Sequence, residues 1–411
     1  MRILALALMQ IYFSVPPVDA PELAKRGSYS VGVRTLDLVN PGQADILNFS
    51  KENGKAPLYD RPLKVEVWYP AVIPEGAKEH TVYTSPMAGR PERIPASAPK
   101  TFQVLGKALR DAAPVKGERF PLVVVSHGYP GSRTFLSYLT ENLASKGYVV
   151  AAIDHTDSVF GDVKGFASTL LNRSNDQLFT IDALGDFGGL VDPSRAAIVG
   201  YSMGGYGALA SAGAGYNAQG GASKIVPGGY MEPLTAGSPK FATRRHANLK
   251  AFVAISPWGA QPPQDNWDSQ GLAGIRIPSL FVVGDHDDVS GYEQGVKKAF
   301  DGAVHSERCM LIYQNANHNV GGNPPPDEAL GDIATREFFD EPVWRKDRIG
   351  AINQHFITAF LDLYLKGDES KRSYLHLAVE KSNDGVWPAT YWKGFQRRWA
   401  MGMEMHCAGA Q

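Results

Sequence analysis

The sequence predicts an α/β protein with a mostly parallel, doubly wound sheet of about eight strands, and three observations carry this prediction. Short apolar, β-branched stretches recur along the 411 residues and alternate with segments of helical periodicity. The later stretches are almost continuously apolar, which is typical of strands that helices cover on both faces. Alternation of strand and helix favours parallel strands joined by helical crossovers.

The expected strands fall into two groups. Arg34–Val39 and Lys64–Tyr69 alternate apolar with polar residues, so we expect them to pair antiparallel at one edge of the sheet. The remaining strands are expected in the sheet interior at Pro121–Ser126, Tyr148–Ile153, Ala196–Gly200, Leu249–Ile255, Ser279–Val283 and Cys309–Tyr313.

Helical patterns separate these strands. Apolar residues recur at helical spacing in the longest pattern, which ends the main run of elements. Helices are expected over Thr134–Lys146, Ser174–Leu184, Met203–Ala212, Gly291–Phe300 and Arg348–Lys366.

Three stretches do not fit the alternation and are interpreted as insertions into one domain that spans residues 28–411. Glu75–Glu118 is rich in proline and polar residues, Gly213–Asn248 is rich in glycine, and Gly321–Glu341 is rich in proline and acidic residues. Long connections of this kind usually lie over one end of a sheet, where lids form. We therefore expect lid-type insertions near 75–118, 213–248 and 321–341.

Residues 1–27 are expected to be either a leader or an N-terminal extension. A short apolar run follows Arg2, and Val18 and Ala20 place small residues at −3 and −1 of a cleavage site, as in a secretory leader. The alternative is an ordered segment that lies on the domain. If residues 1–20 are a signal peptide, the protein is secreted or periplasmic, and otherwise it is cytoplasmic.

Composition excludes several function classes. Lys and Arg (41) nearly balance Asp and Glu (42), which argues against a nucleic-acid partner. After the N-terminus no segment reaches the roughly 18–20 apolar residues needed to cross a bilayer, so no integral membrane segment is expected. Cys309 and Cys407, the two cysteines, exclude a multi-disulfide scaffold and a zinc site of several thiolates. They either pair or remain free, and we expect neither a metal nor another cofactor.

The strongest motif is AAIVGYSMGG at residues 196–205. An apolar strand runs into Gly200, Tyr201, Ser202, Met203 and Gly204, a G-x-S-x-G sequence, and then into a helix of small residues. A serine on such a tight strand-to-helix turn projects its Oγ from the sheet edge, and flanking glycines avoid collisions there. Ser202 is therefore the predicted nucleophile.

An acid and a histidine follow in the order that this arrangement requires. The strand at 279–283 ends in a cluster of Asp285, Asp287 and Asp288, and the strand at 309–313 is followed by His318. His318 is expected to act as general base and acid, and the carboxylate to orient its imidazole. Loops of this type often read Gly-x-x-Asp, which favours Asp287. The same cluster with His286 also matches a hard-cation site, which the pattern favours less because neighbouring side chains in one short run do not easily converge on one ion.

The backbone N–H groups of Met203 and Tyr129 are the expected oxyanion donors. Tyr129 lies in the SHGYPG loop that follows the strand at 121–126, where Pro130 has no N–H. In the same loop we expect His127 to hold the turn rather than act as a base. Trp258, which follows the strand at 249–255, is expected either to form a wall of the substrate pocket or to pack in the core.

These motifs resemble those of the α/β-hydrolases, in particular the dienelactone-hydrolase-like esterases and the secreted and type II platelet-activating-factor acetylhydrolases. The resemblance covers most of Gly27–Lys366. It is carried by the strand end VEVWYP at 65–70, the SHGYPG loop, the GYSMGG turn, the GDHDD loop at 284–288 and the NANH loop at 315–318. Dienelactone hydrolases use a cysteine nucleophile where this chain has Ser202, so the resemblance implies ester hydrolysis through an acyl-serine.

The sequence therefore predicts a serine carboxylesterase acting on a small, uncharged ester. The alternatives are an amidase or peptidase with the same three residues, a phospholipid or acetyl-ester hydrolase, and a non-catalytic binding protein of the same fold. Nothing in the sequence indicates an oligomeric state.

Overall fold

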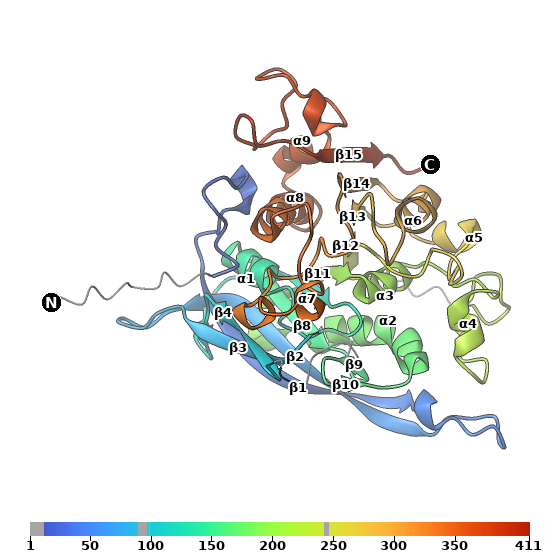
Figure 1. Ribbon diagram of the computed structural model, residues 1–411. Coiled ribbons are helices and arrows are strands. Elements are labelled where there is room, and N and C mark those ends of the chain that lie inside the picture. The colour runs from blue at the N-terminus through green and yellow to red at the C-terminus, as the bar shows by residue number, and fades with distance from the viewer. Residues whose placement is uncertain (1–11, 89–96, 98, 242–245) are drawn as a thin grey trace.

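The computed structural model describes residues 12–88, 97, 99–241 and 246–411. The start of the predicted leader, residues 1–11, lies outside the described residues. The chain forms one large mixed sheet with helices on both faces, as Figure 1 shows. The predicted fold class, an α/β-hydrolase fold with a mostly parallel sheet, is confirmed.

Eleven strands of the described residues form the main sheet, in the order β15-β14-β13-β12-β11-β7-β8-β2-β1-β5, with β6 pairing to β2. The strands from β14 to β8 run parallel. Their bounds are β7 Phe120–Ser126, β8 Val149–Asp154, β11 Val191–Tyr201, β12 Leu249–Ile255, β13 Ser279–Gly284 and β14 Arg308–Tyr313.

Antiparallel strands flank the parallel strands on both sides, with β15 next to β14 and β2 next to β8. The predicted antiparallel pair is present as β1 (Ser30–Ala44) and β2 (Leu58–Val72), each much longer than expected. The sheet is also wider than the predicted eight strands. It gains the short β5 (Leu109–Arg110) and β6 (Ala113–Pro114), and β15 (Met403–Ala408) at the far edge. Strands β5 and β6 have two residues each, and β15 lacks a continuous apolar run, so the sequence pattern did not predict them.

The two faces of the sheet are buried by different helices. Alternate residues of β7 belong to different cores, Val123 and Val125 to one and Leu122 and Val124 to the other. Helices α1 (Ser137–Ser145) and α8 (Lys346–Lys366) contribute to the first core. Helices α2 (Phe166–Ala183), α3 (Met203–Ser211) and α6 (Lys298–Gly302) contribute to the second. This burial on both faces explains the continuous apolar runs in the sequence.

Two predicted helices differ from expectation. Helix α2 begins at Phe166 rather than Ser174, because Leu170 and Leu171 extend its buried face toward the N-terminus. The helix expected over 291–300 begins instead as a π-helical turn, Tyr292–Lys297, which continues into α6.

The three predicted insertions lie in different places. The first forms the hairpin of β3 (Thr81–Pro86) and β4 (Thr101–Gly106), and the third contains α7 (Ile333–Arg336). These two meet, because Phe102 packs edge-on against Phe339 at 5.3 Å. The second insertion contains α4 (Gly221–Ile225), and Tyr216 in it stacks on Trp267 at 5.6 Å. A lid role for any of them stays a prediction.

The described part of the N-terminal segment packs on α1 and α8. Ser14 is buried and its hydroxyl donates to Glu141 of α1 at 2.5 Å. The Leu23 N–H donates to His355 of α8 at 3.1 Å, and the Lys146 ammonium donates to the Leu23 carbonyl at 2.6 Å. None of the described helices combines the length and the apolar character that crossing a bilayer requires.

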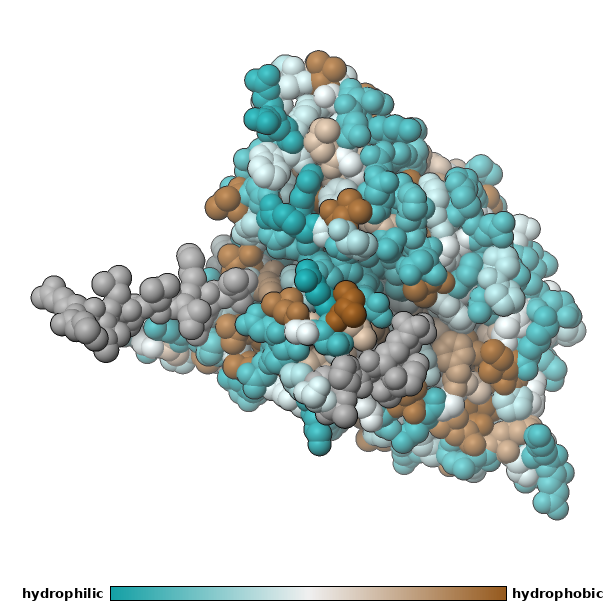
Figure 2. Space-filling view, in the orientation of Figure 1, coloured by the Kyte–Doolittle hydropathy of each residue, from teal (hydrophilic) through white to brown (hydrophobic). Residues whose placement is uncertain are grey.

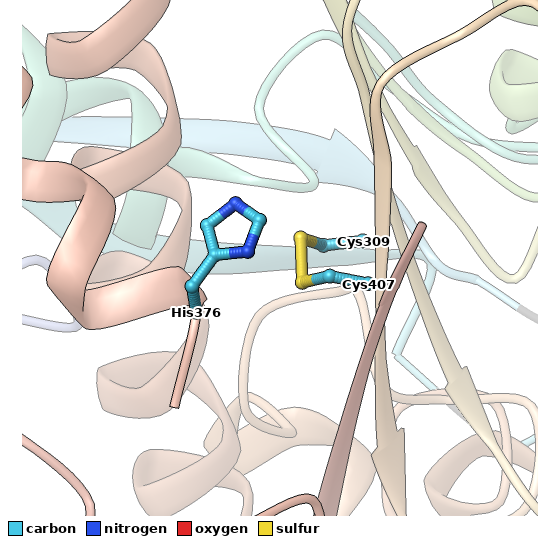
Figure 3. A group of neighbouring side chains, drawn as sticks. All are labelled: Cys309, His376 and Cys407. Atoms are coloured by element: carbon cyan, nitrogen blue, oxygen red, sulfur yellow. A yellow bond between two sulfur atoms is a disulfide. The ribbon is translucent and has the colours of Figure 1, made fainter. Parts of the chain in front are cut away.

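A disulfide joins the edge strand β15 to its neighbour β14. Cys309 and Cys407 are register partners, and their sulfurs are bonded at 2.00 Å (Figure 3). With His376, which points toward the disulfide, they make the one group of three close metal-binding side chains among the described residues. Both sulfurs are committed to the disulfide, so neither supplies the thiolate that metals bind.

Candidate active site

The serine of the G-x-S-x-G motif lies on a sharp turn between β11 and α3. Ser202 has a φ of 53° and a ψ of −113°, a conformation that side chains rarely adopt, and its N–H donates to Ile255 of β12 at 2.8 Å. A Cβ on Gly200 would lie 2.2 Å from the Gly204 carbonyl oxygen, and one on Gly204 would lie 2.0 Å from the Ser126 oxygen. The close approach of backbone to backbone therefore demands glycine on both sides of Ser202.

Ser202, His318 and Asp287 form one chain of hydrogen bonds. The Ser202 hydroxyl lies 3.0 Å from His318 Nε2. His318 Nδ1 lies 2.9 and 3.0 Å from the two carboxylate oxygens of Asp287. A carboxylate only accepts, so Nδ1 carries the proton and Nε2 is free to accept from the serine. All three side chains are largely buried.

The structure brings one of the three candidate aspartates to the imidazole. Asp287 also accepts the N–H groups of Val289 at 3.0 Å and Ser290 at 2.7 Å. Burial by itself would raise the pKa of Asp287, but His318 and these two N–H donors outweigh burial and hold that pKa below its ordinary value. Asp285 instead accepts from His286 and from the Asn315 N–H.

Asp288 takes a third position. Its exposed side chain lines the cleft in front of Ser202 rather than contacting His318. The three aspartates therefore point to three different surroundings, which argues against their convergence on one cation.

The two predicted oxyanion donors border Ser202 on different elements. Met203 begins α3, so its N–H lies at a helix N-terminus. Tyr129 lies in the loop after β7, and a Cβ on its neighbour Gly128 would lie only 3.3 Å from the Ser202 Cβ. Within the described residues neither N–H has an intramolecular acceptor. The role of both N–H groups as oxyanion donors stays a prediction.

His127 orients the loop that carries Tyr129. Its Nδ1–H donates to the Gly128 carbonyl at 2.7 Å, and its Nε2 accepts the His155 N–H at 3.3 Å. Burial and the nearby Arg173 charge lower the pKa of His127, so the ring stays neutral, as this pattern needs. The carbonyl and N–H of a trans peptide point in opposite directions, so fixing the Gly128 carbonyl also fixes the Tyr129 N–H.

Trp258 lies beside the turn but does not line the cleft. Its backbone N–H donates to the Ser202 carbonyl at 3.1 Å. Its ring packs edge-on against Phe166, with ring centroids 5.5 Å apart, and its centroid lies 6.0 Å from that of Tyr206. Of the two predicted roles, the geometry matches packing, and substrate contact stays a prediction.

A buried ionic network contacts the start of the Tyr129 loop, at Ser126 and His127. Arg61 donates to both carboxylate oxygens of Asp176 at 2.8 and 3.0 Å. His155 Nδ1–H donates to Asp176 at 3.0 Å, which leaves Nε2 to accept the Ser126 hydroxyl at 2.7 Å. Ser126 is the last residue of β7. Arg173 donates to the backbone carbonyl of the following residue, His127, at 2.8 Å. Burial would raise the pKa of Asp176, but Arg61 and His155 lower it to about 2.

Replacing Arg61 with methionine is expected to lower the free energy of unfolding by about 3–5 kcal/mol, because Asp176 would stay buried without its cation. The side chain of Arg61 is 1% exposed, whereas that of Arg34, which pairs with Asp111, is 42% exposed. Arg34→Met is therefore the matched control, with an expected loss below about 1 kcal/mol. Urea unfolding measures both. Equal losses would mean that the buried network does not stabilise the fold.

The pH dependence of this contribution follows from the lowered pKa of Asp176. A carboxyl with a lowered folded-state pKa stabilises the fold above its unfolded-state pKa of about 4. Its contribution is lost as the pH falls toward the folded-state value of about 2.

A cleft of about 690 Å³ opens in front of Ser202. Its apolar and aromatic lining comes from Tyr129, Phe135, Tyr201, Phe338 and Ile333. Acidic side chains and Arg336 also reach it, and Arg336 pairs with Asp340 at 2.8 Å. Figure 2 views the face on which α7 lies and shows apolar residues among hydrophilic ones there.

The sequence predicted that the third insertion lies over one end of the sheet, but it named none of the insertion's residues that line this cleft. Seven of the 19 residues that line the cleft lie between Ile333 and Glu341, and Phe135 and Tyr201 supply aromatic rings that stack at 6.0 Å. The pair of aromatic residues Phe338 and Phe339, in a polar and proline-rich stretch, was the signal that could have found it.

Comparison with known proteins agrees with the fold and the motifs. A family model described as platelet-activating factor acetylhydrolase, isoform II, matches residues 104–161, which include the Tyr129 loop. Cutinase est2 of Thermobifida alba is 34% identical over 206 residues, 50% of this chain and 55% of that protein. The dog platelet-activating factor acetylhydrolase is 51% identical over 41 residues, 10% of this chain and 9% of that protein. The chain thus spans about half the length of the cutinase, and the predicted resemblance is confirmed.

Among solved structures, the ferulic acid esterase of Streptomyces cinnamoneus superposes with a TM-score of 0.54. The match covers 85% of this chain and 94% of the esterase at 22% identity, so it supports the fold alone. The sheet, the turn at Ser202 and this superposition together show that the chain has an α/β-hydrolase fold.

Proposed function

We propose that this protein is a serine carboxylesterase that cleaves small, uncharged esters through an acyl-serine intermediate. The observation that carries the proposal is the hydrogen-bonded chain from Ser202 through His318 to Asp287, with Ser202 and His318 in the lining of a cleft that also has apolar and aromatic side chains. The names of the matched relatives, which are cutinase, acetylhydrolase and esterase, are those of ester-cleaving enzymes.

Acylation follows from this arrangement. The Ser202 oxygen attacks the ester carbonyl carbon while His318 Nε2 accepts the hydroxyl proton. Negative charge develops on the carbonyl oxygen, where the N–H groups of Met203 and Tyr129 stabilise it. The carboxylate of Asp287 stabilises the imidazolium. His318 then protonates the leaving oxygen, so the carbon–oxygen bond breaks and the alcohol departs.

Deacylation reverses these roles. A water molecule gives a proton to His318 and its oxygen attacks the acyl carbon. The tetrahedral adduct collapses, the proton returns to the Ser202 oxygen, and the carboxylic acid leaves. Each step uses side chains and backbone groups of this chain, with water as the second substrate.

A second candidate is an acetyl-ester hydrolase acting on phospholipid-like substrates. The family match over residues 104–161 favours it, although the match covers the Tyr129 loop and leaves out the α7 wall of the cleft. Both candidates use the same chemistry and differ in the acyl and alcohol groups that the cleft accepts.

Hydrolysis of p-nitrophenyl esters from acetate to palmitate tests the proposal. We expect hydrolysis with a maximum at short acyl chains, and much slower cleavage of the matched anilide. A maximum at palmitate would indicate a lipid substrate instead. Failure to hydrolyse any ester, by protein whose folding is confirmed by circular dichroism, would overturn the proposal.

A further inference from the structure

His318 lies in a loop whose two flanking residues are held by one carboxylate. The N–H of Asn317 donates to Glu341 Oε2 at 2.8 Å, and the N–H of Asn319 donates to Glu341 Oε1 at 2.6 Å. The two carboxylate oxygens of Glu341 therefore accept the backbone N–H groups on both sides of His318. Each N–H-to-carboxylate bond is charge-assisted and stronger than a neutral one.

A second anchor reaches the same loop from α8. The ammonium of Lys346 donates a short hydrogen bond to the Asn319 carbonyl. Glu341 and Lys346 are both at least 95% buried, so water reaches little of either side chain. Burial lowers the pKa of Lys346 to about 8, and the carboxylate of Glu341 opposes that shift.

The side chain of Asn319 completes the attachment. Its amide donates to the backbone carbonyls of Glu337 at 2.7 Å and Asp340 at 3.0 Å. The histidine loop is thus fastened to the segment between α7 and α8, which belongs to the third insertion and its continuation.

Glu341 has charged neighbours on several elements. Burial raises its pKa, whereas the Asn317 N–H and the Lys346 charge lower it, and the Asp288 charge raises it. Both oxygens accept an N–H, an arrangement that suits the ionised carboxylate. An amide in its place offers one acceptor and one donor, so an N–H of the loop would face an N–H of the side chain.

We propose that Glu341 is a positioning residue that holds His318 in line with Ser202, with Lys346 as a second anchor. This proposal rests on the proposed esterase function. Proton transfer requires the Nε2 to stay within hydrogen-bonding reach of Ser202 and of the leaving oxygen. A misplacement of about 1 Å can cost a hundredfold in rate, so loosening the loop is expected to slow the chemistry more than binding.

Glu341→Gln tests the proposal by a split between kcat and KM and by leaving-group dependence. We expect kcat to fall about tenfold to a hundredfold while KM stays within about twofold. An ethyl ester needs a proton from His318 to release its alcohol, whereas p-nitrophenolate leaves without one. The loss in kcat/KM is therefore expected to be larger for the ethyl ester than for the p-nitrophenyl ester of the same acid.

Glu328→Gln is the matched control, because Glu328 lies in the same insertion and, among the described residues, its carboxylate accepts one hydrogen bond, from the Gln103 N–H at 3.2 Å. It should retain wild-type rates on both esters. If Glu341→Gln does not fold, Lys346→Met replaces it and should show the same leaving-group signature. Wild-type leaving-group dependence in the folded variant, or equal losses on both esters with a lowered Tm, would overturn the positioning role.

Failure of this proposal differs from failure of the proposed function. If wild-type protein hydrolyses esters and Glu341→Gln behaves like the control, the esterase assignment stands and the positioning role is lost. If wild-type protein hydrolyses no ester, the assignment itself is wrong, and Glu341 then has no reaction to support.

Discussion

Replacing Ser202 with alanine is expected to lower kcat for ester hydrolysis by about five to six orders of magnitude. The variant lacks the oxygen that forms the acyl intermediate, so only the oxyanion donors and substrate binding remain to accelerate attack by water. Alanine fits the site without a steric cost, because it is smaller than serine. The p-nitrophenyl assay measures the loss, and near-ultraviolet circular dichroism checks the fold.

A fluorophosphonate probe separates chemistry from loss of folding. It should label wild-type protein at Ser202 and leave Ser202→Ala unlabelled. The chain offers an internal control, because Ser126 also bonds a histidine, His155, that in turn bonds an aspartate. Ser126 is completely buried, so the probe should not reach it. Labelling that persists in Ser202→Ala would identify a different nucleophile.

Asp287→Asn is expected to lower kcat by about four orders of magnitude with the fold intact. The asparagine oxygen can still accept the N–H groups of Val289 and Ser290, which turns its NH₂ group toward His318 Nδ1. That nitrogen must then accept, so the proton moves to Nε2. The histidine can no longer take the proton of Ser202.

The neighbouring aspartates provide matched controls for Asp287→Asn. Asp288 lines the cleft and Asp285 bonds His286, so neither variant alters the histidine tautomer. Asp285→Asn and Asp288→Asn should therefore keep kcat within a few fold of wild type. A loss of four orders of magnitude in Asp288→Asn alone would assign the acid role to Asp288.

Much of the fold was predictable because its determinants are local. Burial on both faces imposes continuous apolar runs on β7, β11 and β13, and those runs are visible in the sequence. Strand β15 was not predicted because it lies at an edge and only Met403 and Met405 of its six residues are buried, so its sequence has no continuous apolar run. The early start of α2 was missed because its buried face becomes visible only when packed against the sheet.

Some features of the candidate site are likewise determined locally, and others depend on the tertiary structure. The turn at Ser202 is determined within a few residues, because the backbone approaches itself too closely for any side chain at Gly200 or Gly204. The order of serine, acid and histidine follows from the order of the parallel strands, whose carboxyl ends meet at one edge. The sequence alone therefore predicted Ser202 and His318, and it favoured Asp287 among three neighbouring aspartates.

Only the tertiary structure decided which groups meet. Asp287 contacts His318 across 31 residues, Glu341 contacts Asn319 across 22, and Arg61 contacts Asp176 across 115. Such contacts depend on loop paths and side-chain directions, which no local sequence pattern encodes. The sequence alone does not distinguish an aspartate that faces solvent from one that pairs with a buried cation. The turn at Ser202 and the sheet depend on local backbone geometry and strand burial, which leave a visible pattern in the sequence. Long-range packing determines that Asp287 meets His318, and it also forms the Arg61–Asp176 network beside the Tyr129 loop and the contacts of Glu341 with the His318 loop.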